Sequence, residues 1–384
     1  MKILQPHNLI IIAIVILGCT LPKDISDKAN LAKDTVVKDS LTLQLVDERK
    51  YFLDSTSNSI TSSVQVFPID SPAFMIFHHT YSSNIAIYDM QTGSQVSEIT
   101  LKKEGPDGVG NGIRGMYFHN FDSIFLLSLM EQRLYLIDSA GKLKSKMNIG
   151  DDHYYAQLGT IFPAFLKGGS LYLCTYPSPG TDISAAGYSS LQINLSSLEV
   201  RNVFHLSSNY DNGAWGRHHY SRTSHLYNDK TGQVILSFPN DHFLYVIAGD
   251  KTTKYYAGAY KIKKLRPLTK RSDFDKDDIV FRHEAMQGSY SSVFFDRWRN
   301  LYYRLAFSPV GGDYESPFDT EKETSIIILD TGFNKVGEYY LEPDTYSYLA
   351  MFIAPQGLDL FNKKKYASDE DFLYFDVFDV KVKD

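Results

Sequence analysis

Short apolar and aromatic runs recur along the chain from Leu41 to its end, each broken by Gly, Pro, Asn, Asp or Ser. No window keeps a helical apolar stripe over three turns, so the pattern predicts strands and an all-β fold. The segments Ile183–Ser190 and Lys363–Asp371 are expected to be loops, because neither has the spacing of an amphipathic helix.

A repeat appears when similar apolar runs, most of which end on an acidic or amide residue, are aligned. Its copies are Ile85–Asp89, Leu134–Asp138, Leu191–Asn194, Phe243–Ile247, Ile326–Asp330 and Phe372–Asp376. Their mean spacing of about 57 residues fits one four-stranded propeller blade of about 40–50 residues plus a longer loop. We therefore predict a six-bladed β-propeller, with seven blades as the alternative count.

The runs are apolar at consecutive positions, which is typical of strands buried on both faces. Two packed immunoglobulin-like sandwiches, the rival all-β fold, would leave one face of each sheet wet and restore alternation. The run Leu41–Val46 precedes the first copy, and the run Phe372–Lys383 ends the chain. Pairing of these two runs in one blade would close the ring and protect its open edges.

The chain begins with a segment that is typical of export. The apolar run Leu9–Leu17 is too short for the roughly 20 residues of a membrane-spanning helix, but it suits the core of a signal peptide. It ends in Ile-Leu-Gly-Cys at Cys19, which resembles the bacterial lipobox. We predict a lipoprotein signal peptide over residues 1–18, lipidation of Cys19, a flexible tether over 19–40 and the propeller domain over 41–384.

The lipid on Cys19 would attach the protein to a membrane. Thr20 stands where an Asp would retain an enterobacterial lipoprotein in the inner membrane, so the outer membrane is favoured, on its periplasmic or cell-surface side. The alternative reading of the segment is a buried apolar strand that happens to end in Cys.

The composition narrows the class of protein further. With 384 residues, 43% of them hydrophobic, the chain is not a disordered one, and a formal net charge of −6 gives no general affinity for nucleic acid. There are two cysteines, so acylation of Cys19 leaves Cys174 without a disulfide partner. Cys174 lies in the apolar run Leu171–Tyr176 and is expected to be a small buried hydrophobe.

Two short stretches add a family resemblance. Lys103–Gly108 (KEGPDG) and Asp296–Arg304 (DRWRNLYYR), together with the lipobox and the spacer, resemble an uncharacterised family of Bacteroidota lipoproteins. The resemblance covers essentially the whole mature chain and implies a propeller fold and an envelope location. Since the family has no established activity, the resemblance implies no reaction.

The densest cluster of polar and aromatic residues is the segment 215–225. Its candidate ligand-binding residues are Trp215, Arg217, His218, His219 and Arg222. Adjacent residues on a strand point to opposite faces, so His218 and His219 would not both bind one metal ion, and no metal site is predicted. Arginines that pair with anions, beside aromatic rings, favour a ligand-facing loop over a metal site, and ordinary blade structure is the alternative.

Three further candidates lie outside that segment. Arg114 belongs to Gly110–Gly115, which matches G-x-G-x-x-G but precedes a strand-like run, so a blade-connecting loop is expected rather than a dinucleotide site. Tyr303 and Arg304 lie in an apolar run, where a guanidinium must face a wet central channel or form an ion pair with Asp296 or Glu284. If Arg304 faces the channel, it would share a cationic, aromatic mouth with the 215–225 segment.

The segment Asp273–Glu284 places acidic residues at several positions of a calcium-binding loop. Asp278 occupies the position that needs Gly for the sharp turn, so a solvated acidic loop is the favoured interpretation.

The chain has no H-E-x-x-H, G-x-S-x-G or P-loop motif, and no cofactor is predicted. These observations favour a lipid-anchored module that binds a small molecule, a glycan or a protein, and not an enzyme. The alternative is a propeller hydrolase or lyase that acts on a glycan or peptide.

Overall fold

The computed structural model describes residues 39–383, except for 55–58, 60, 83, 151–152, 179–180, 184–186, 217–218 and 311–321, and it describes His219 by its backbone alone. The predicted signal peptide, the lipidation site Cys19 and nearly all of the predicted tether therefore lie outside the described residues. So do Arg217, His218 and the side chain of His219.

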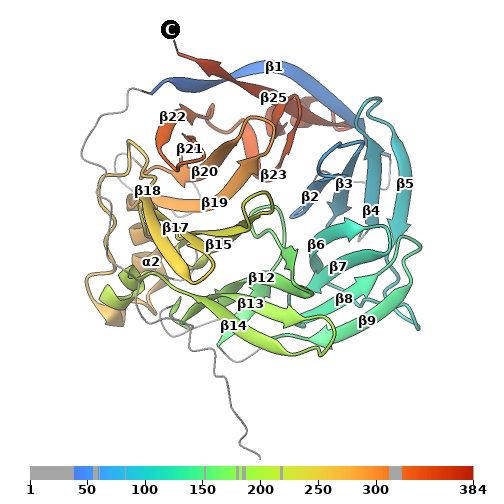
Figure 1. Ribbon diagram of the computed structural model, residues 1–384, viewed down its shortest axis with the longest axis horizontal. Coiled ribbons are helices and arrows are strands. Elements are labelled where there is room, and N and C mark those ends of the chain that lie inside the picture. Colours follow the sequence, from blue (N-terminus) through green and yellow to red (C-terminus); the bar gives the residue numbers. More distant parts are fainter. Residues whose placement is uncertain are drawn as a thin grey trace, which may run out of the picture.

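The described strands form sheets, antiparallel except where β1 meets β22, that stand around a common axis like the blades of a propeller (Figure 1). Three sheets have four strands each: β2 (Val64–Phe67), β3 (Phe74–His79), β4 (Asn84–Asp89) and β5 (Gln95–Thr100); β6 (Ile113–Asn120), β7 (Ser123–Ser128), β8 (Arg133–Ile137) and β9 (Leu143–Asn148); and β15 (Ser224–Asn228), β16 (Gln233–Ser237), β17 (Phe243–Ala248) and β18 (Lys251–Tyr256). A fourth sheet contains β10 (Tyr154–Gln157), β12 (Ser170–Pro177), β13 (Tyr188–Asn194) and β14 (Val200–His205), with β11 (Phe165–Lys167) paired to β12.

The remaining sheet has eight strands and joins the two ends of the described chain. Its order is β19 (Ser289–Asp296), β20 (Leu301–Phe307), β21 (Thr324–Leu329), β22 (Lys335–Tyr340), β1 (Leu41–Phe52), β25 (Phe372–Val382), β24 (Gly357–Asn362) and β23 (Tyr346–Ala354). β1 pairs with β25 along its whole length, whereas it meets β22 only where Leu41 lies beside Gly337. The prediction that the first and last runs of the domain pair in one sheet is confirmed.

The predicted repeat corresponds to the third strand of each four-stranded unit, namely β4, β8, β13, β17, β21 and β25. The residue that ends several copies organises the turn that follows. Asp89 Oδ1 accepts hydrogen bonds from the backbone N–H groups of Gln91 and Thr92, and Asp138 Oδ1 accepts them from Ala140 and Lys142. A short acidic or amide side chain at a strand end therefore sets the turn to the next strand.

Neighbouring sheets pack face to face, which explains the consecutive apolar positions. Ile76 and Ile87 from one sheet share a core cluster with Met116 and Ile124 from the next. β20 is buried at all seven of its residues. Burial on both faces removes the polar alternation that a sheet with one wet face would show.

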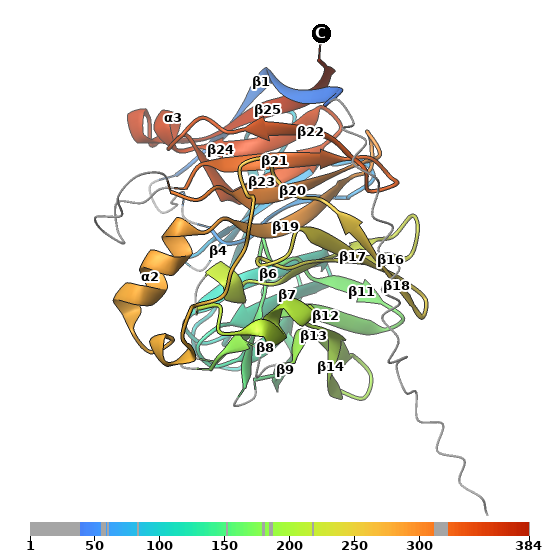
Figure 2. The same cartoon turned by 90° about the vertical axis from the view of Figure 1, so that its left-hand side faces the viewer.

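Helices lie on one face of the ring, which we call the helix-bearing face (Figure 2). They are α2 (Asp277–Met286), α3 (Lys363–Ser368) and the 3₁₀ turns η1 (Ser208–Asn212), η2 (His219–Ser221) and η3 (Arg271–Asp273). The loop prediction for 363–371 was therefore wrong, because the side chain of Asn362 caps α3 by accepting from Lys365 N–H at 3.0 Å. The loop predicted over 183–190 was also wrong at its end, since β13 begins at Tyr188. No described helix is long and apolar enough to span a membrane.

The expected acidic loop over 273–284 is also a helical segment, made of η3 and α2. Asp273 forms an ion pair with Lys276 at 2.8 Å, and Glu284 is a buried residue of α2, so the acidic side chains do not surround one point. Among the described residues, no three His, Cys, Asp or Glu side chains are placed to hold a metal ion.

The connection between β10 and β11 (residues 158–164, the axial segment) crosses toward the inner strands of other sheets. It forms hydrogen bonds from Thr160 N–H to Ser62 O, from Val64 N–H to Thr160 Oγ1, from Ser292 Oγ to Ile161 O, and from His225 Nε2 to Pro163 O. Gly115 on β6 allows this close approach, because a Cβ there would overlap the backbone of Leu158. The axial segment thus occupies the middle of the ring.

Candidate ligand pocket on the helix-bearing face

A pocket of about 380 Å³ lies over the β15–β18 sheet, where three connections meet. The connections are the segment from η1 to residue 215, the turn between β16 and β17 (residues 238–242, the β16–β17 turn), and residues 263–267. Its lining consists of Asn209, Asn212, Trp215, Asn240, His242, Lys263, Lys264, Leu265, Arg266 and Pro267. None of these residues belongs to a strand, and no Asp or Glu is among them.

Asn240 is the unusual member of the lining. It is 0% exposed, and neither its carboxamide oxygen nor its nitrogen has a hydrogen-bond partner among the described residues. A buried amide without partners costs about 1–3 kcal/mol, so such groups are uncommon in folded proteins unless something else satisfies them. Its position beside a pocket makes a bound ligand the natural partner.

Three cationic side chains form the outer part of the pocket. Lys263, Lys264 and Arg266 are exposed, and none of them forms an ion pair with another described residue. Because the chain as a whole has a net charge of −6, this group is a local positive area on an acidic protein. Such an area attracts anions and offers an arginine fork for a carboxylate or phosphate.

Trp215 ties the three connections together. Its indole N–H donates to the backbone carbonyl of Asn209 at 2.9 Å, and the Asn209 side-chain nitrogen donates to the backbone carbonyl of Asn240 at 3.0 Å. The neighbouring Gly216 has φ +98°, and a Cβ there would lie 2.7 Å from Glu284 Oε1. Glycine therefore lets α2 pack against this loop. Trp215 itself is buried, so it contributes structure and one edge to the pocket.

Arg304 holds the β16–β17 turn from below. Its guanidinium donates to the carbonyls of Phe238, Asp241, His242 and Ala257 at 2.8–3.2 Å and to Ser237 Oγ at 3.1 Å. It also stacks on the Tyr290 ring, with its central carbon 3.9 Å from the ring centre. Burial lowers the pKa of Arg304 to about 10, so the side chain is still charged at neutral pH.

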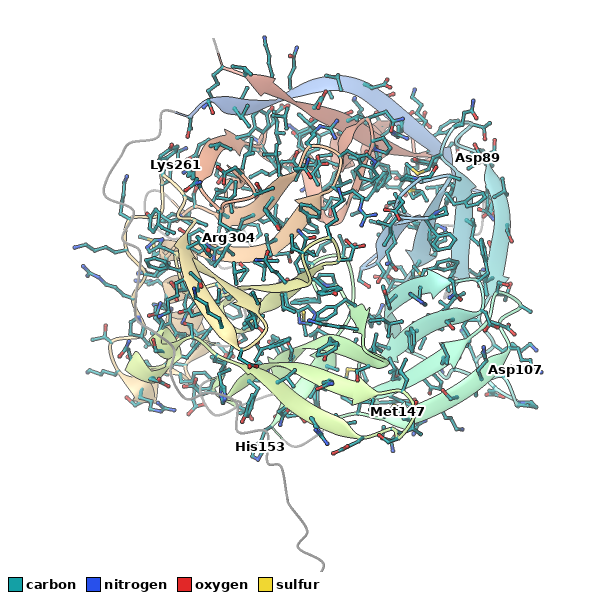
Figure 3. All side chains as sticks on the ribbon, in the orientation of Figure 1. Asp89, Asp107, Met147, His153, Lys261 and Arg304 are labelled. Atoms are coloured by element: carbon teal, nitrogen blue, oxygen red, sulfur yellow. The ribbon has the colours of Figure 1, made fainter. Side chains whose placement is uncertain are left out.

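The two expectations for Arg304 were both wrong. The side chain is 0% exposed within the ring (Figure 3), so it does not face a wet channel, and its described partners are carbonyls and a hydroxyl in place of Asp296 or Glu284. Tyr303 is likewise buried, and its hydroxyl donates to Asp296 Oδ2 at 3.1 Å. Both residues are part of the core, and Arg304 positions the pocket without lining it.

The other predicted residues are spread over the molecule. Trp215 lines the pocket. Arg222 borders a small cavity of about 10 Å³ near the axis, with Ile161 and Tyr290. Arg114 is exposed on β6, where its carbonyl accepts from Ser62 Oγ. The loop expected over Gly110–Gly115 is confirmed only for residues 110–112, since the chain enters a strand, and not a helix, at Ile113.

Among the described residues, no Lys, Arg or His lines the cavity of about 210 Å³ near the axis of the ring. Its lining includes Tyr117, Leu226, Phe294 and Ile353, together with residues of the axial segment. Cys174 is fully buried, and burial raises the pKa of its thiol to about 12, which confirms its expected role as an apolar side chain.

Sequence reasoning missed Asn240, His242, Lys263, Lys264 and Arg266. One signal was present, because Lys261–Arg271 is the most basic stretch near the 215–225 cluster. Nothing in the local pattern around Asn240 indicates that its carboxamide would be buried without a partner.

Comparison with known proteins places these features in a family context. A family model described as "Domain of unknown function (DUF4221)" matches residues 35–340. A crystal structure of a member of that family from Bacteroides vulgatus is 22% identical, with a TM-score of 0.77 over 90% of this chain and 99% of the other. A putative exported protein from Bacteroides fragilis is 11% identical, with a TM-score of 0.56 over 91% of this chain and 98% of the other. No curated protein matches the chain.

Proposed function

Starting from the fact that the chain belongs to the DUF4221 family, we propose that it is an exported, lipid-anchored β-propeller that binds an anionic ligand in the pocket on its helix-bearing face. The observation that carries the proposal is the buried Asn240 carboxamide, which has no partner among the described residues, beside three cations that form no ion pair with them. Binding is favoured over glycoside hydrolysis, because a glycoside-hydrolysing site needs a pair of carboxyl groups and the described lining has none.

We also propose that the ring has six blades. The eight-stranded sheet consists of two four-stranded halves, β19–β22 and β23–β25 with β1, whose strands in the described chain pair with each other only at Leu41 and Gly337. Counting these halves separately adds two blades to the other four sheets.

An envelope location agrees with the description of the Bacteroides fragilis protein as exported. Within that proposal, Cys19→Ser is expected to abolish partitioning of the full-length protein into a detergent phase, because the acylated thiol is lost. The measurement is phase separation in a cloud-point detergent after expression in a bacterium that processes lipoproteins. Cys174→Ala is the matched control, because it removes the buried second cysteine and should leave partitioning unchanged. Equal partitioning of Cys19→Ser and the unmodified protein would contradict lipidation.

The anion site itself is tested by charge reversal. The double variant Lys263→Glu/Lys264→Glu is expected to lower the affinity for acidic oligomers about tenfold, since two exposed charges contribute roughly 0.5–1 kcal/mol each and reversal adds repulsion. The measurement is fluorescence anisotropy of labelled hexagalacturonate and labelled hexaglutamate at two salt concentrations.

The control variant Lys142→Glu/Lys146→Glu makes the same change in net charge at exposed positions around β9, away from the pocket. It should bind like the unmodified protein. An equal loss in both double variants would indicate a general charge effect and contradict a localised site.

A further inference from the structure

We propose that the ligand of this pocket is an acidic carbohydrate, with its hydroxyl groups bound by Asn240 and His242 and its acidic groups bound by the cationic side chains outside them. This inference rests on the proposed function, because it names the chemical class that the anion site would accept. The groups that indicate this class lie in the inner, neutral part of the pocket.

Asn240 offers a donor and an acceptor together. The side-chain nitrogen donates and the oxygen accepts, and both atoms are buried and unpartnered among the described residues. A carboxylate or phosphate oxygen only accepts, so it would leave the Asn240 oxygen without a donor. A hydroxyl group donates and accepts, and two neighbouring hydroxyls can satisfy both ends of one carboxamide.

His242 adds a second neutral group. The backbone N–H of Ala259 donates to the Tyr290 hydroxyl at 3.0 Å, and that hydroxyl lies 2.6 Å from His242 Nδ1. The hydroxyl either donates to Nδ1, which leaves Nε2–H as a donor, or accepts from Nδ1–H, which leaves Nε2 as an acceptor. Burial and the nearby Arg304 lower the pKa of His242, which favours the neutral imidazole, and a ligand hydroxyl can pair with Nε2 in either tautomer.

An acidic peptide fits this pocket less well. Extended peptides usually gain affinity by pairing with an exposed strand edge, but every described lining residue lies in a loop or a 3₁₀ turn. Carboxamides, an imidazole and cations are the groups that match a hydroxyl-rich anion.

The test compares two probes that carry the same number of carboxylates, hexagalacturonate and hexaglutamate, against the full-length protein. We expect the carbohydrate to bind at least tenfold more tightly. Asn240→Leu should weaken hexagalacturonate at least tenfold and leave hexaglutamate within twofold, because it removes only the hydroxyl-binding group. Lys263→Glu/Lys264→Glu should weaken both probes.

His242→Phe is the second variant, since it keeps a planar ring and removes the polar Nε2 atom, and it tests the inference if Asn240→Leu fails to fold by circular dichroism. It should also lower the affinity for the carbohydrate alone. Equal affinities of the unmodified protein for the two probes would overturn the assignment to a carbohydrate while leaving an anion site intact. So would Asn240→Leu and His242→Phe variants that each weaken hexagalacturonate and hexaglutamate to the same extent. Failure of both probes to bind the unmodified protein would instead overturn the proposed function.

Discussion

Arg304→Ala is expected to destabilise the protein by about 5 kcal/mol or more, at the upper end of what single substitutions do. The change removes five charge-assisted hydrogen bonds of about 1.5–3 kcal/mol each. Four carbonyls lose a donor, although those of Phe238 and His242 still accept from the backbone N–H groups of Asp241 and Ala257. The change also opens a cavity against Tyr290, which Arg304 now covers. In a protein of this size, the melting temperature should fall on the order of 10 °C.

The same substitution should abolish binding in the pocket even at temperatures where the variant is folded, because Arg304 holds the turn that carries Asn240 and His242. Thermal unfolding and anisotropy with hexagalacturonate measure the two effects. The stability of Arg304→Lys should lie between those of Arg304→Ala and the unmodified protein, since an ammonium group keeps the charge and loses the planar fork.

Arg201→Ala is the matched control for this experiment. Arg201 is exposed on β14 and pairs with Glu199 at the surface, and such pairs contribute about 0–1 kcal/mol. Its melting temperature should stay within about 2 °C of the unmodified protein. If Arg304→Ala melted like Arg201→Ala, the carbonyls would have other donors and Arg304 would not be the clamp described above.

The fold was predictable because its signal is local. Several copies of the repeat, such as Ile85–Asp89, contain both a buried strand and the side chain that sets the next turn, so alignment within the chain was sufficient. The pairing of Leu41–Val46 with the last run was also predictable, because an open ring would leave unpaired edges.

Helix α2 shows where the pattern failed. Its buried residues are Val280, Glu284 and Ala285, so only two of its buried positions are apolar. The local sequence therefore lacks a stripe, and the helix depends on packing over the loop at Gly216, a contact between distant parts of the chain.

The pocket was missed for a related reason. Asn209, Asn240 and Lys263 come from three different connections, and only the folded ring brings them together. Arg304 was noticed because a charge in an apolar run is costly, and that reasoning correctly required partners. The expected partners of Arg304 were carboxylates or water, whereas its observed partners are backbone carbonyls at the end of the adjacent sheet.

Deletion of β1 (Leu41–Phe52) from the full chain is expected to abolish cooperative unfolding. β1 pairs with β25 in eleven register pairs, and Tyr51 packs against Phe375 of β25 and Tyr88 of β4, with ring centres 5.8 and 5.5 Å apart. The strand therefore joins the last sheet to the first. Its removal would expose the edge of β25 and the cores on both sides.

The control keeps the strand and changes only its surface. Leu45→Ser/Val46→Ser replaces two side chains that are about half exposed, so the double variant should melt within about 3 °C of the unmodified protein. Differential scanning calorimetry distinguishes a single sharp transition from a broad or absent one. Addition of a peptide with the sequence of residues 41–52 to the deleted chain should restore part of the transition, because the binding edge on β25 is still encoded. A deleted chain that unfolds in one sharp transition at the original temperature would show that β25 needs no partner and that the ring is stable without this closure.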